Sequence, residues 1–225
     1  MFSMTGNCTN LAIFTTELKR MSEFDIKAGE WDKNRMHRER AEAVAGAIMK
    51  RISPGRQMSV MEYGAGTGLL SFLLKDHVGS ITMIDNSEGM VGVLRQKIEE
   101  SGSPGLKVLM ADLEKEDYTG EKFDLICTLM VMHHVNDVEL ILGKFSAMLR
   151  PGGWLAIADL YAEDGSFHGH GFTGHRGFDT GELAILLERN GFGNLDTETV
   201  YSIDRITPDN DRKKFDVFLM TAVRR

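Results

Sequence analysis

The sequence predicts an α/β fold in which helices cover both faces of a mainly parallel β-sheet. Short β-rich runs alternate with longer segments of helical periodicity, which is typical of such a sheet. The first run, residues 60–63, breaks into glycines at alternate positions directly before the apolar stretch 69–74. The last two runs have no helical segment between them, so we expect them to form an antiparallel hairpin.

Helix caps divide the chain into elements. Gly102 closes one helix, since glycine readily adopts the backbone conformation that ends helices. Asp137 opens another helix, which ends before Pro151 because proline cannot continue it. Asp179 and Glu182 form a capping box for a later helix. In chain order we expect a helix at residues 35–52, a strand at 60–63, a helix at 69–74, a strand at 81–85, a helix at 90–100, strands at 106–111 and 123–129, a helix at 138–149, a strand at 154–160, a helix at 183–189, and strands at 199–206 and 215–223.

The composition fits one globular domain. With 225 residues, of which 42% are hydrophobic and 26% are charged, the chain is long enough to bury a full core. It has no apolar run near the ~20 residues that cross a bilayer, and its first residues lack the basic-then-apolar order of a secretory signal. We therefore expect a cytoplasmic protein without membrane contact, in which Cys8 and Cys127 are reduced and structural. The formal net charge of -7 disfavours nucleic acid as a partner.

The turn that contains Gly64, Gly66 and Gly68 can hold a ligand against bare backbone. A tight turn that binds no ligand is the plain alternative. A dinucleotide fingerprint G-x-G-x-x-G needs its third glycine at position 69, where this chain has Leu69. This spacing, together with Glu62 before the turn, disfavours a nicotinamide-dependent oxidoreductase.

Short motifs follow one another between residue 30 and the C-terminus. They are Glu62-x-Gly64-x-Gly66-x-Gly68, Asp85 at the end of the second strand, Asp112-Leu113 after the third, Phe123-Asp124-Leu125-Ile126 as the fourth, and Leu149-Arg150-Pro151-Gly152-Gly153 before the fifth. In this order they resemble the class I S-adenosylmethionine-dependent methyltransferases of the small-molecule type, which includes methyltransferase types 11 and 12. The resemblance implies a Rossmann-like seven-stranded sheet in the order 3-2-1-4-5-7-6, with strand 7 antiparallel. It also implies S-adenosyl-L-methionine as the cofactor and S-adenosyl-L-homocysteine as its product.

The resemblance suggests where the domain begins. We expect residues 1–29 to be an N-terminal extension that is free to move, and residues 30–225 to be the methyltransferase domain. The amphipathic helix at 35–52 forms an N-terminal arm that packs on the sheet or closes over the cofactor. Trp31 covers the cofactor or substrate, or else fixes the arm as an aromatic staple.

Side-chain chemistry gives each residue of the motifs a role towards the cofactor. The glycines admit its methionyl part, and Glu62 receives its ammonium group directly or through water. Asp85 accepts the ribose hydroxyls, although a carboxylate there can instead cap a helix or a turn. Asp112 accepts from the adenine amino group or only caps a turn, and the Leu113 amide reaches a ring nitrogen. The expected cofactor residues are Glu62, Gly64, Ala65, Gly66, Gly68, Asp85, Asn86, Met90, Asp112, Leu113 and Thr128.

The segment 128–134 leaves the carboxyl end of the fourth strand, where open α/β sheets place their reactive centres. Many enzymes that methylate base or amide nitrogen carry Asn/Asp-Pro-Pro-aromatic here, and this chain does not, so we disfavour such acceptors. His133 or His134, with a pKa near its usual value, can take a proton from a hydroxyl or thiol, or else bonds the backbone as a structural group. Adjacent residues point different ways, so we expect at most one to face the methyl group. Asp159, at the tip of the fifth strand, is the third catalytic candidate, or it anchors the lid backbone.

Residues 161–178 form a long loop rich in glycine, histidine and aromatic residues, which we interpret as a lid over the substrate. Its histidines could bind a metal together with His133 or His134. However, their spacing matches no standard site and no cysteine lies nearby, so we expect no metal. The substrate candidates are Trp31, Tyr161, His168, His170 and His175.

The sequence therefore predicts an enzyme that transfers a methyl group from S-adenosylmethionine to a small-molecule substrate. The acceptor atom stays open among a hydroxyl oxygen, a thiol sulfur, an amine nitrogen and a carbon. Two alternatives also stay open. One is a regulatory protein that binds the cofactor without catalysis, and the other, less favoured, is an NAD-dependent oxidoreductase.

Overall fold

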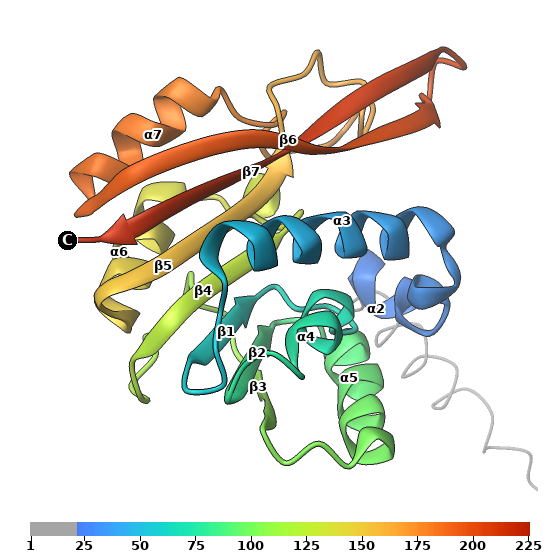
Figure 1. The fold of residues 1–225 in the computed structure, drawn as a ribbon. Coiled ribbons are helices and arrows are strands. Elements are labelled where there is room, and N and C mark those ends of the chain that lie inside the picture. The colour runs from blue at the N-terminus through green and yellow to red at the C-terminus, as the bar shows by residue number, and fades with distance from the viewer. Residues whose placement is uncertain (1–21) are drawn as a thin grey trace, which may run out of the picture.

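One seven-stranded sheet organises the molecule (Figure 1). The structure is a computed structural model that describes residues 22–225, so the expectations for Cys8 and the rest of residues 1–21 lie outside it. The strand order is β3-β2-β1-β4-β5-β7-β6. Strands β1 to β5 run parallel, and β7 lies antiparallel between β5 and β6. The expected α/β class, strand order and antiparallel seventh strand are confirmed.

Helices separate the parallel strands along the described chain as far as β5, except that β4 follows β3 directly. The helices are α2 (Glu23–Lys27), α3 (Arg35–Ile52), α4 (Leu69–Leu74), α5 (Glu88–Ser101), α6 (Val138–Met148) and α7 (Thr180–Arg189), with 3₁₀-helices η1 (Ala28–Lys33) and η2 (Met132–His134). The strands are β1 (Ser59–Tyr63), β2 (Ser80–Asp85), β3 (Leu106–Met110), β4 (Phe123–Leu129), β5 (Leu149–Leu160), β6 (Phe192–Ile206) and β7 (Arg212–Arg224).

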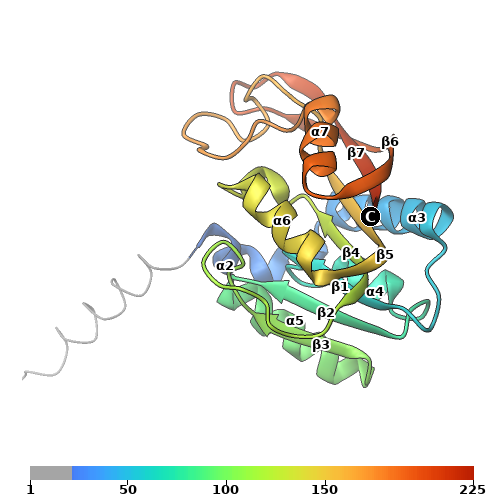
Figure 2. The ribbon, with the colours of Figure 1, turned by 90° about the vertical axis from the view of Figure 1, so that its left-hand side faces the viewer.

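Two apolar clusters lie on opposite faces of the sheet. Val60 belongs to one and Met61 to the other, because successive side chains of a strand point to opposite faces. Phe145 of α6 packs in the first cluster and Ile48 of α3 in the second. Figure 2 shows these two helices on opposite sides of strands β4 and β5. Cys127, expected to be reduced and structural, is a free thiol buried in the second cluster.

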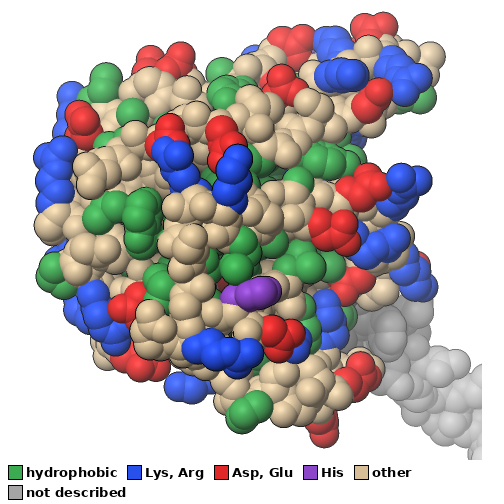
Figure 3. All heavy atoms as spheres, in the orientation of Figure 1, with side chains coloured by type: hydrophobic (Ala, Val, Ile, Leu, Met, Phe, Trp, Pro, Cys, Tyr) green, Lys and Arg blue, Asp and Glu red, His purple; other side chains and the backbone are tan. Residues whose placement is uncertain are grey.

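The surface carries mixed charge. Figure 3 shows acidic and basic side chains interspersed over the face on which α3 and α4 lie. Several of them form exposed ion pairs, such as the one between Arg35 and Glu39 one helical turn apart. Between residues 22 and 225, no helix has both the length and the apolar composition needed to cross a membrane.

Two strands begin earlier than the sequence predicts. The Pro-Gly-Gly segment after Arg150 is typical of a turn, yet β5 already starts at Leu149, which pairs with Phe123. A register shift between Phe123 and Leu125 accommodates the extra residues, as a β-bulge does. Strand β6 starts at Phe192 instead of residue 199 and also contains register shifts against β7. Such bulges interrupt the alternation of polar and apolar residues that marks a strand in the sequence.

The N-terminal segment packs on the domain before residue 30. The Asp25 carboxylate accepts hydrogen bonds from the Ser87 hydroxyl at 2.6 Å and the Gly89 amide at 2.9 Å, both at the start of α5. Lys97 of α5 donates to Asp32 at 2.7 Å. From here on, residues 22–34 are called the arm, and the helix at 35–52, expected to form an arm, is called α3. The domain boundary expected at residue 30 falls inside η1, and the carboxylates of Asp25 and Asp32 on both sides of it bind the same helix.

The turn after β1 has a conformation that only glycine adopts easily. Gly64 has φ +66°, and a Cβ built on it would lie 2.4 Å from a methyl carbon of Val131. Val131 follows β4, so the two adjacent strand ends approach each other closely at this point. The absence of a side chain at Gly64 is thus required both by the backbone angle and by the neighbouring strand.

We predict that Gly64→Ala lowers the free energy of unfolding by about 2 kcal/mol or more, from backbone strain and overpacking together. Gly92→Ala is the matched control, because a Cβ at Gly92 of α5 meets nothing within 4 Å. It should stabilise the protein by about 0.5–1 kcal/mol, since alanine favours a helix interior. Urea unfolding of the parent and both variants measures the two effects. Equal stability of Gly64→Ala and the parent would contradict this account of the turn.

Candidate active site

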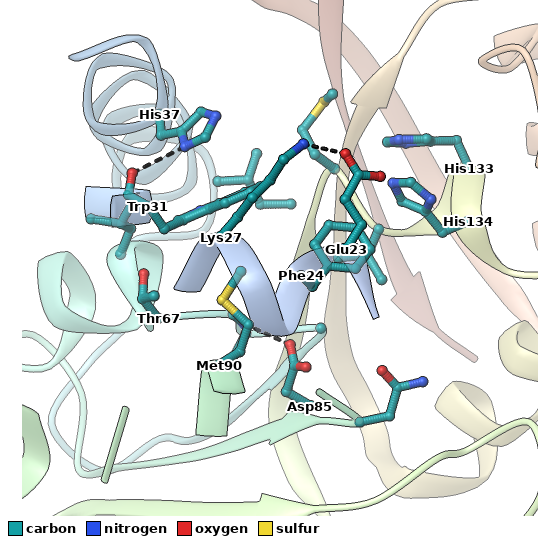
Figure 4. A pocket seen from close by; sticks show the side chains of 18 of the residues that line it. Glu23, Phe24, Lys27, Trp31, His37, Thr67, Asp85, Met90, His133 and His134 are labelled. Atoms are coloured by element: carbon teal, nitrogen blue, oxygen red, sulfur yellow. Dashed lines mark hydrogen bonds and ion pairs between the residues drawn. The ribbon is translucent and has the colours of Figure 1, made fainter. Parts of the chain in front are cut away.

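A cavity of about 1010 Å³ lies at the carboxyl ends of the parallel strands. Chain order reverses direction between β1 and β4, and open α/β sheets bind ligands at such a point. The glycine-rich turn and the end of β2 form one end of the cavity, and the segment after β4 forms the other. The arm and the lid contribute the remaining walls (Figure 4).

Gly66 and Asp85 are joined by a hydrogen bond at the end of the cavity that the glycine-rich turn and β2 form. The Gly66 amide donates to Oδ2 of Asp85 at 2.7 Å, and the Ser87 amide donates to Oδ1 at 2.8 Å. Burial raises the pKa of Asp85 above its ordinary value, although these backbone bonds oppose the shift. A Cβ built on Gly66 would come no nearer than 3.9 Å to another atom, the Met90 sulfur, so the backbone here is open on the cavity side. A ligand can therefore lie directly against it.

Glu62 is a buried carboxyl group at the end of β1. Its Oε2 accepts hydrogen bonds from the Ser71 amide at 3.0 Å and from the Ser71 hydroxyl. Burial raises the pKa of Glu62 to about 8 despite these bonds. A cationic group beside it would favour the ionised form and lower that pKa again.

Asp112 lies on the cavity wall after β3 and also stabilises its own turn. Its Oδ1 accepts from the Glu114 amide at 3.1 Å, and Lys115 donates to Oδ2 at 2.6 Å. The turn-capping role left open in the sequence is therefore present, and the side chain still lines the cavity beside Asn86. Leu113, by contrast, is buried in the first apolar cluster.

Aromatic side chains of the arm and of α3 cover the cavity. The Trp31 ring lies 4.1 Å from the His37 ring and 6.0 Å from the Phe24 ring, measured between centroids. Figure 4 shows Trp31 and His37 on the side of the cavity where Thr67 lies, and Phe24 towards His134. Trp31 thus holds the arm against His37 of α3 and lines the cavity at the same time. Burial, followed by the positive charge of Arg40, lowers the pKa of His37 to about 4.

Arg40 is a charged residue in the apolar stripe of α3. It lies four residues from both Met36 and Val44, so all three share one helix face. Arg40 is buried and lines the cavity, and its Nε has no hydrogen-bond partner within the described chain. Burial lowers its pKa to about 10, while the charge of Asp159 acts in the opposite direction. Arg40 is not among the residues predicted from the sequence, although a charge within an apolar stripe is a signal for a functional site.

Asp159 and His133 form a fully buried pair at the other end of the cavity. His133 Nδ1 lies 2.6 Å from Oδ1 of Asp159, and the His133 amide donates to Oδ2 at 3.2 Å. The Leu160 amide also donates to Oδ1, at 2.7 Å. Asp159 therefore orients the imidazole and leaves Nε2 of His133 for another partner. Asp159 itself does not line the cavity.

His134 and His168 lie against the His133 ring. The centroid of the His133 ring is 4.1 Å from that of His134 and 5.1 Å from that of His168. Burial, followed by repulsion from His133, lowers the pKa of both His134 and His168 to about 4. The expectation that His134 has an ordinary pKa is therefore wrong. The tight 3₁₀ turn η2 brings both paired histidines to the cavity, and the expectation that at most one of them faces the methyl group stays a prediction.

The lid brings only some of its candidates to the cavity. His168 lines it and stacks on Phe172 with 3.9 Å between ring centroids. The His170 side chain lies at the cavity rim and is 93% exposed. Tyr161 points away, with its hydroxyl 3.1 Å from that of Thr199. The His175 amide donates to the His133 carbonyl at 2.8 Å, which holds the lid against η2.

Most of the residues singled out in the sequence meet in this cavity. Gly68, Leu113 and Thr128 of the cofactor set do not line it, nor do Tyr161 and His175 of the substrate set. The candidates that line it are Glu62, Gly64, Ala65, Gly66, Asp85, Asn86, Met90, Asp112, His133, His134, Trp31, His168 and His170.

Several curated proteins with similar sequences are methyltransferases by name. Residues 61–157 match the family model described as a methyltransferase domain. Over 155 residues the chain is 28% identical to an uncharacterized methyltransferase of Schizosaccharomyces pombe, which covers 62% of this chain and 55% of the relative. Over 115 residues it is 31% identical to the ubiquinone biosynthesis O-methyltransferase of Rhizobium rhizogenes, covering 51% of this chain and 46% of that protein. The chain thus spans about half the length of these relatives.

Solved structures share the fold at low sequence identity. A SAM-dependent methyltransferase from Aquifex aeolicus has a TM-score of 0.62 at 19% identity, covering 87% of this chain and 97% of that one. The N-methyltransferase NodS from Bradyrhizobium japonicum, in complex with S-adenosylhomocysteine, has a TM-score of 0.65 at 20% identity, covering 87% and 90%. Residues 61–157 thus match a methyltransferase domain, and the strand order is the one expected for the class I S-adenosylmethionine-dependent methyltransferases.

Proposed function

We propose that the protein transfers the methyl group of S-adenosylmethionine to a small-molecule acceptor bound beside His133 and His134. The observation that carries the proposal is one cavity with two chemically different ends. Carboxylates and open backbone lie at the end formed by β1 and β2, and imidazoles lie at the end formed by the segment after β4. When bound, the cofactor supplies a methyl group that its sulfonium already activates.

The residues at the first end fit the cofactor. The open backbone at Gly66 admits a ligand, and Asp85 keeps lone pairs for two ribose hydroxyls beyond those used by its amide partners. We assign Glu62 to the ammonium group of the cofactor, since a buried carboxyl is best compensated by a cation. Asn86, Met90 and Asp112 line the same end and complete the set towards ribose and adenine.

At the acceptor end of the cavity we assign the role of base to His133, whose ring is positioned by Asp159. Because His133 Nδ1 bonds to Asp159, Nε2 can take the proton of a hydroxyl or thiol acceptor. Phe24, Phe172 and Trp31 line the cavity. Their apolar surfaces remove water from the reactants, and the walls of the cavity hold the reactants in line. Arg40 faces the same cavity with an unpartnered Nε, which favours an acceptor that carries an anionic group.

The acceptor atom is not restricted further by the relatives. Among them are the ubiquinone biosynthesis O-methyltransferase of Rhizobium rhizogenes and the phosphatidylethanolamine N-methyltransferase of Cereibacter sphaeroides, the second 33% identical over 106 residues. Their names cover oxygen and nitrogen acceptors. Radiolabelled S-adenosylmethionine with a panel of phenols, hydroxy acids, thiols and amines tests the proposal directly, and cofactor binding without transfer to any of them would favour a regulatory role.

We predict that binding of S-adenosylhomocysteine at pH 7 releases close to one proton from Glu62. The group has a pKa of about 8, and an ammonium partner lowers that pKa, so the affinity should rise as the pH increases from 6 to 8. Calorimetry in two buffers with different ionisation enthalpies measures the proton release, and NAD serves as the non-binding comparison.

Glu62→Gln should bind more weakly and show no dependence on the buffer. Glu99→Gln, at an exposed position of α5, is the matched control and should behave as the parent does. Heat that does not depend on the buffer in the parent protein would show that Glu62 does not receive the ammonium group.

We predict that His133→Ala lowers kcat for a hydroxyl or thiol acceptor by ~10²-fold or more, the size of a general-base contribution. Asp159→Asn should lower kcat in the same direction and change its pH profile, because it alters which nitrogen of His133 carries the proton. The affinity for S-adenosylhomocysteine should stay within about twofold, since neither residue lies at the cofactor end. His77→Ala, on the exposed loop after α4, is the control. Full rates with the parental pH profile in both variants would remove His133 and Asp159 from the acceptor side.

A further inference from the structure

Three histidines from two separate segments converge at the acceptor end of the cavity. One ring nitrogen each of His133, His134 and His168 lies within 4.8 Å of the other two. The first two come from η2 and the third from the lid, so only the folded chain assembles the group. Imidazole nitrogen is the commonest protein ligand for zinc-type metal ions.

The hydrogen bond to Asp159 prepares His133 for a metal ion. It uses Nδ1 at 2.6 Å and fixes the ring, so that Nε2 keeps a free lone pair. Histidines that bind metals almost always bond a carboxylate or carbonyl through their other nitrogen in this way. Asp159 is fully buried and makes no contact with the cavity, which suits such an outer partner.

His168 supplies an independent observation. Its Nε2 is buried and has no hydrogen-bond partner within the part of the chain that the structure describes. Buried polar atoms are nearly always paired, so a lone one calls for a ligand. Stacking on Phe172 holds the ring in place beside the paired histidines.

The charges around the cluster also suit a cation. The negative charges of Glu23 and Asp159 stabilise positive charge at His134 and His168. The positive charge of Arg205 destabilises positive charge at His168.

We propose that His133, His134 and His168 bind one zinc-type divalent ion, with Asp159 as the outer partner of His133 and a fourth coordination position open to the cavity. Zn–N bonds of about 2.0–2.1 Å in a tetrahedral site place the nitrogens about 3.3 Å apart. The histidines must therefore draw closer together than their 4.8 Å limit, and His168 can do so because it lies on the lid. The expectation of no metal came from spacing along the chain, which does not show that the lid folds back onto η2.

The open position gives the ion a role in the proposed reaction. An acceptor hydroxyl or thiol would bind there as its anion and give up its proton to bulk water as it enters the cavity, because a divalent ion lowers the pKa of its ligand. His133 would then act as a ligand and not as a free base. This use of the ion rests on the proposed function, whereas the binding of the ion does not.

Metal binding is measured on the full chain without a histidine tag, stripped with a chelator, and without S-adenosylmethionine. Zn²⁺ is titrated in competition with a chromogenic chelator, and Co²⁺ is added as a spectroscopic probe. We expect one Zn²⁺ per chain and the intense visible absorption of four-coordinate Co²⁺. His168→Ala should weaken Zn²⁺ binding at least 100-fold and abolish the Co²⁺ spectrum, and Asp159→Asn should weaken binding about 10- to 100-fold.

Two controls locate the ion. His170→Ala removes an exposed histidine from the same lid, and His77→Ala removes one from the loop after α4, so both should bind Zn²⁺ as the parent does. Circular dichroism checks that each variant is folded, and His168→Gln replaces His168→Ala if the latter is not. No saturable Zn²⁺ binding by the parent, or equal binding by a folded His168 variant, overturns the proposal. A Zn²⁺ site without methyl transfer would contradict only the proposed function.

Discussion

The buried carboxylate of Asp159 is the group on which the acceptor side of this protein depends. A carboxylate without solvent must be compensated by hydrogen bonds and positive charge, and three donors from His133 and Leu160 supply the bonds. These bonds fix η2 against β5. The backbone of η2 in turn holds the lid, because the His133 carbonyl accepts from the His175 amide. One charge at the end of β5 thus determines where the histidines of two segments meet.

The cofactor end follows a different principle. Backbone amides of Gly66 and Ser87 converge on Asp85, so the turn after β1 and the end of β2 are tied together by one carboxylate. Asp25 and Asp32 then fasten the arm to α5 across this end. The two ends share walls but have separate hydrogen-bond networks, and variants at one end should leave binding at the other end intact.

Local patterns were sufficient to predict the framework of this fold. Phe123–Leu129 is a strand as its apolar run indicates, and Arg35–Ile52 is a helix with the bounds that its periodicity gives. Asp85 could be placed beside the glycine-rich turn because the carboxyl ends of neighbouring parallel strands share one edge of the sheet. The early start of β5 could not be predicted, since a bulge against β4 overrides the turn preference of its Pro-Gly-Gly segment. Which lid histidines reach the cavity depends on contacts between residues far apart in the chain, and no local pattern distinguishes His168, which lines it, from His175, which does not.

The central claim is that the glycine-rich turn and the end of β2 hold S-adenosylmethionine. The most direct measurement is the affinity of S-adenosylhomocysteine for Asp85→Ala, with Asp76→Ala as a control at an exposed site. The account predicts a loss of about 1–3 kcal/mol in the first variant, or about 5- to 150-fold in Kd, and no loss in the second. Unchanged affinity in a folded Asp85→Ala protein would contradict it.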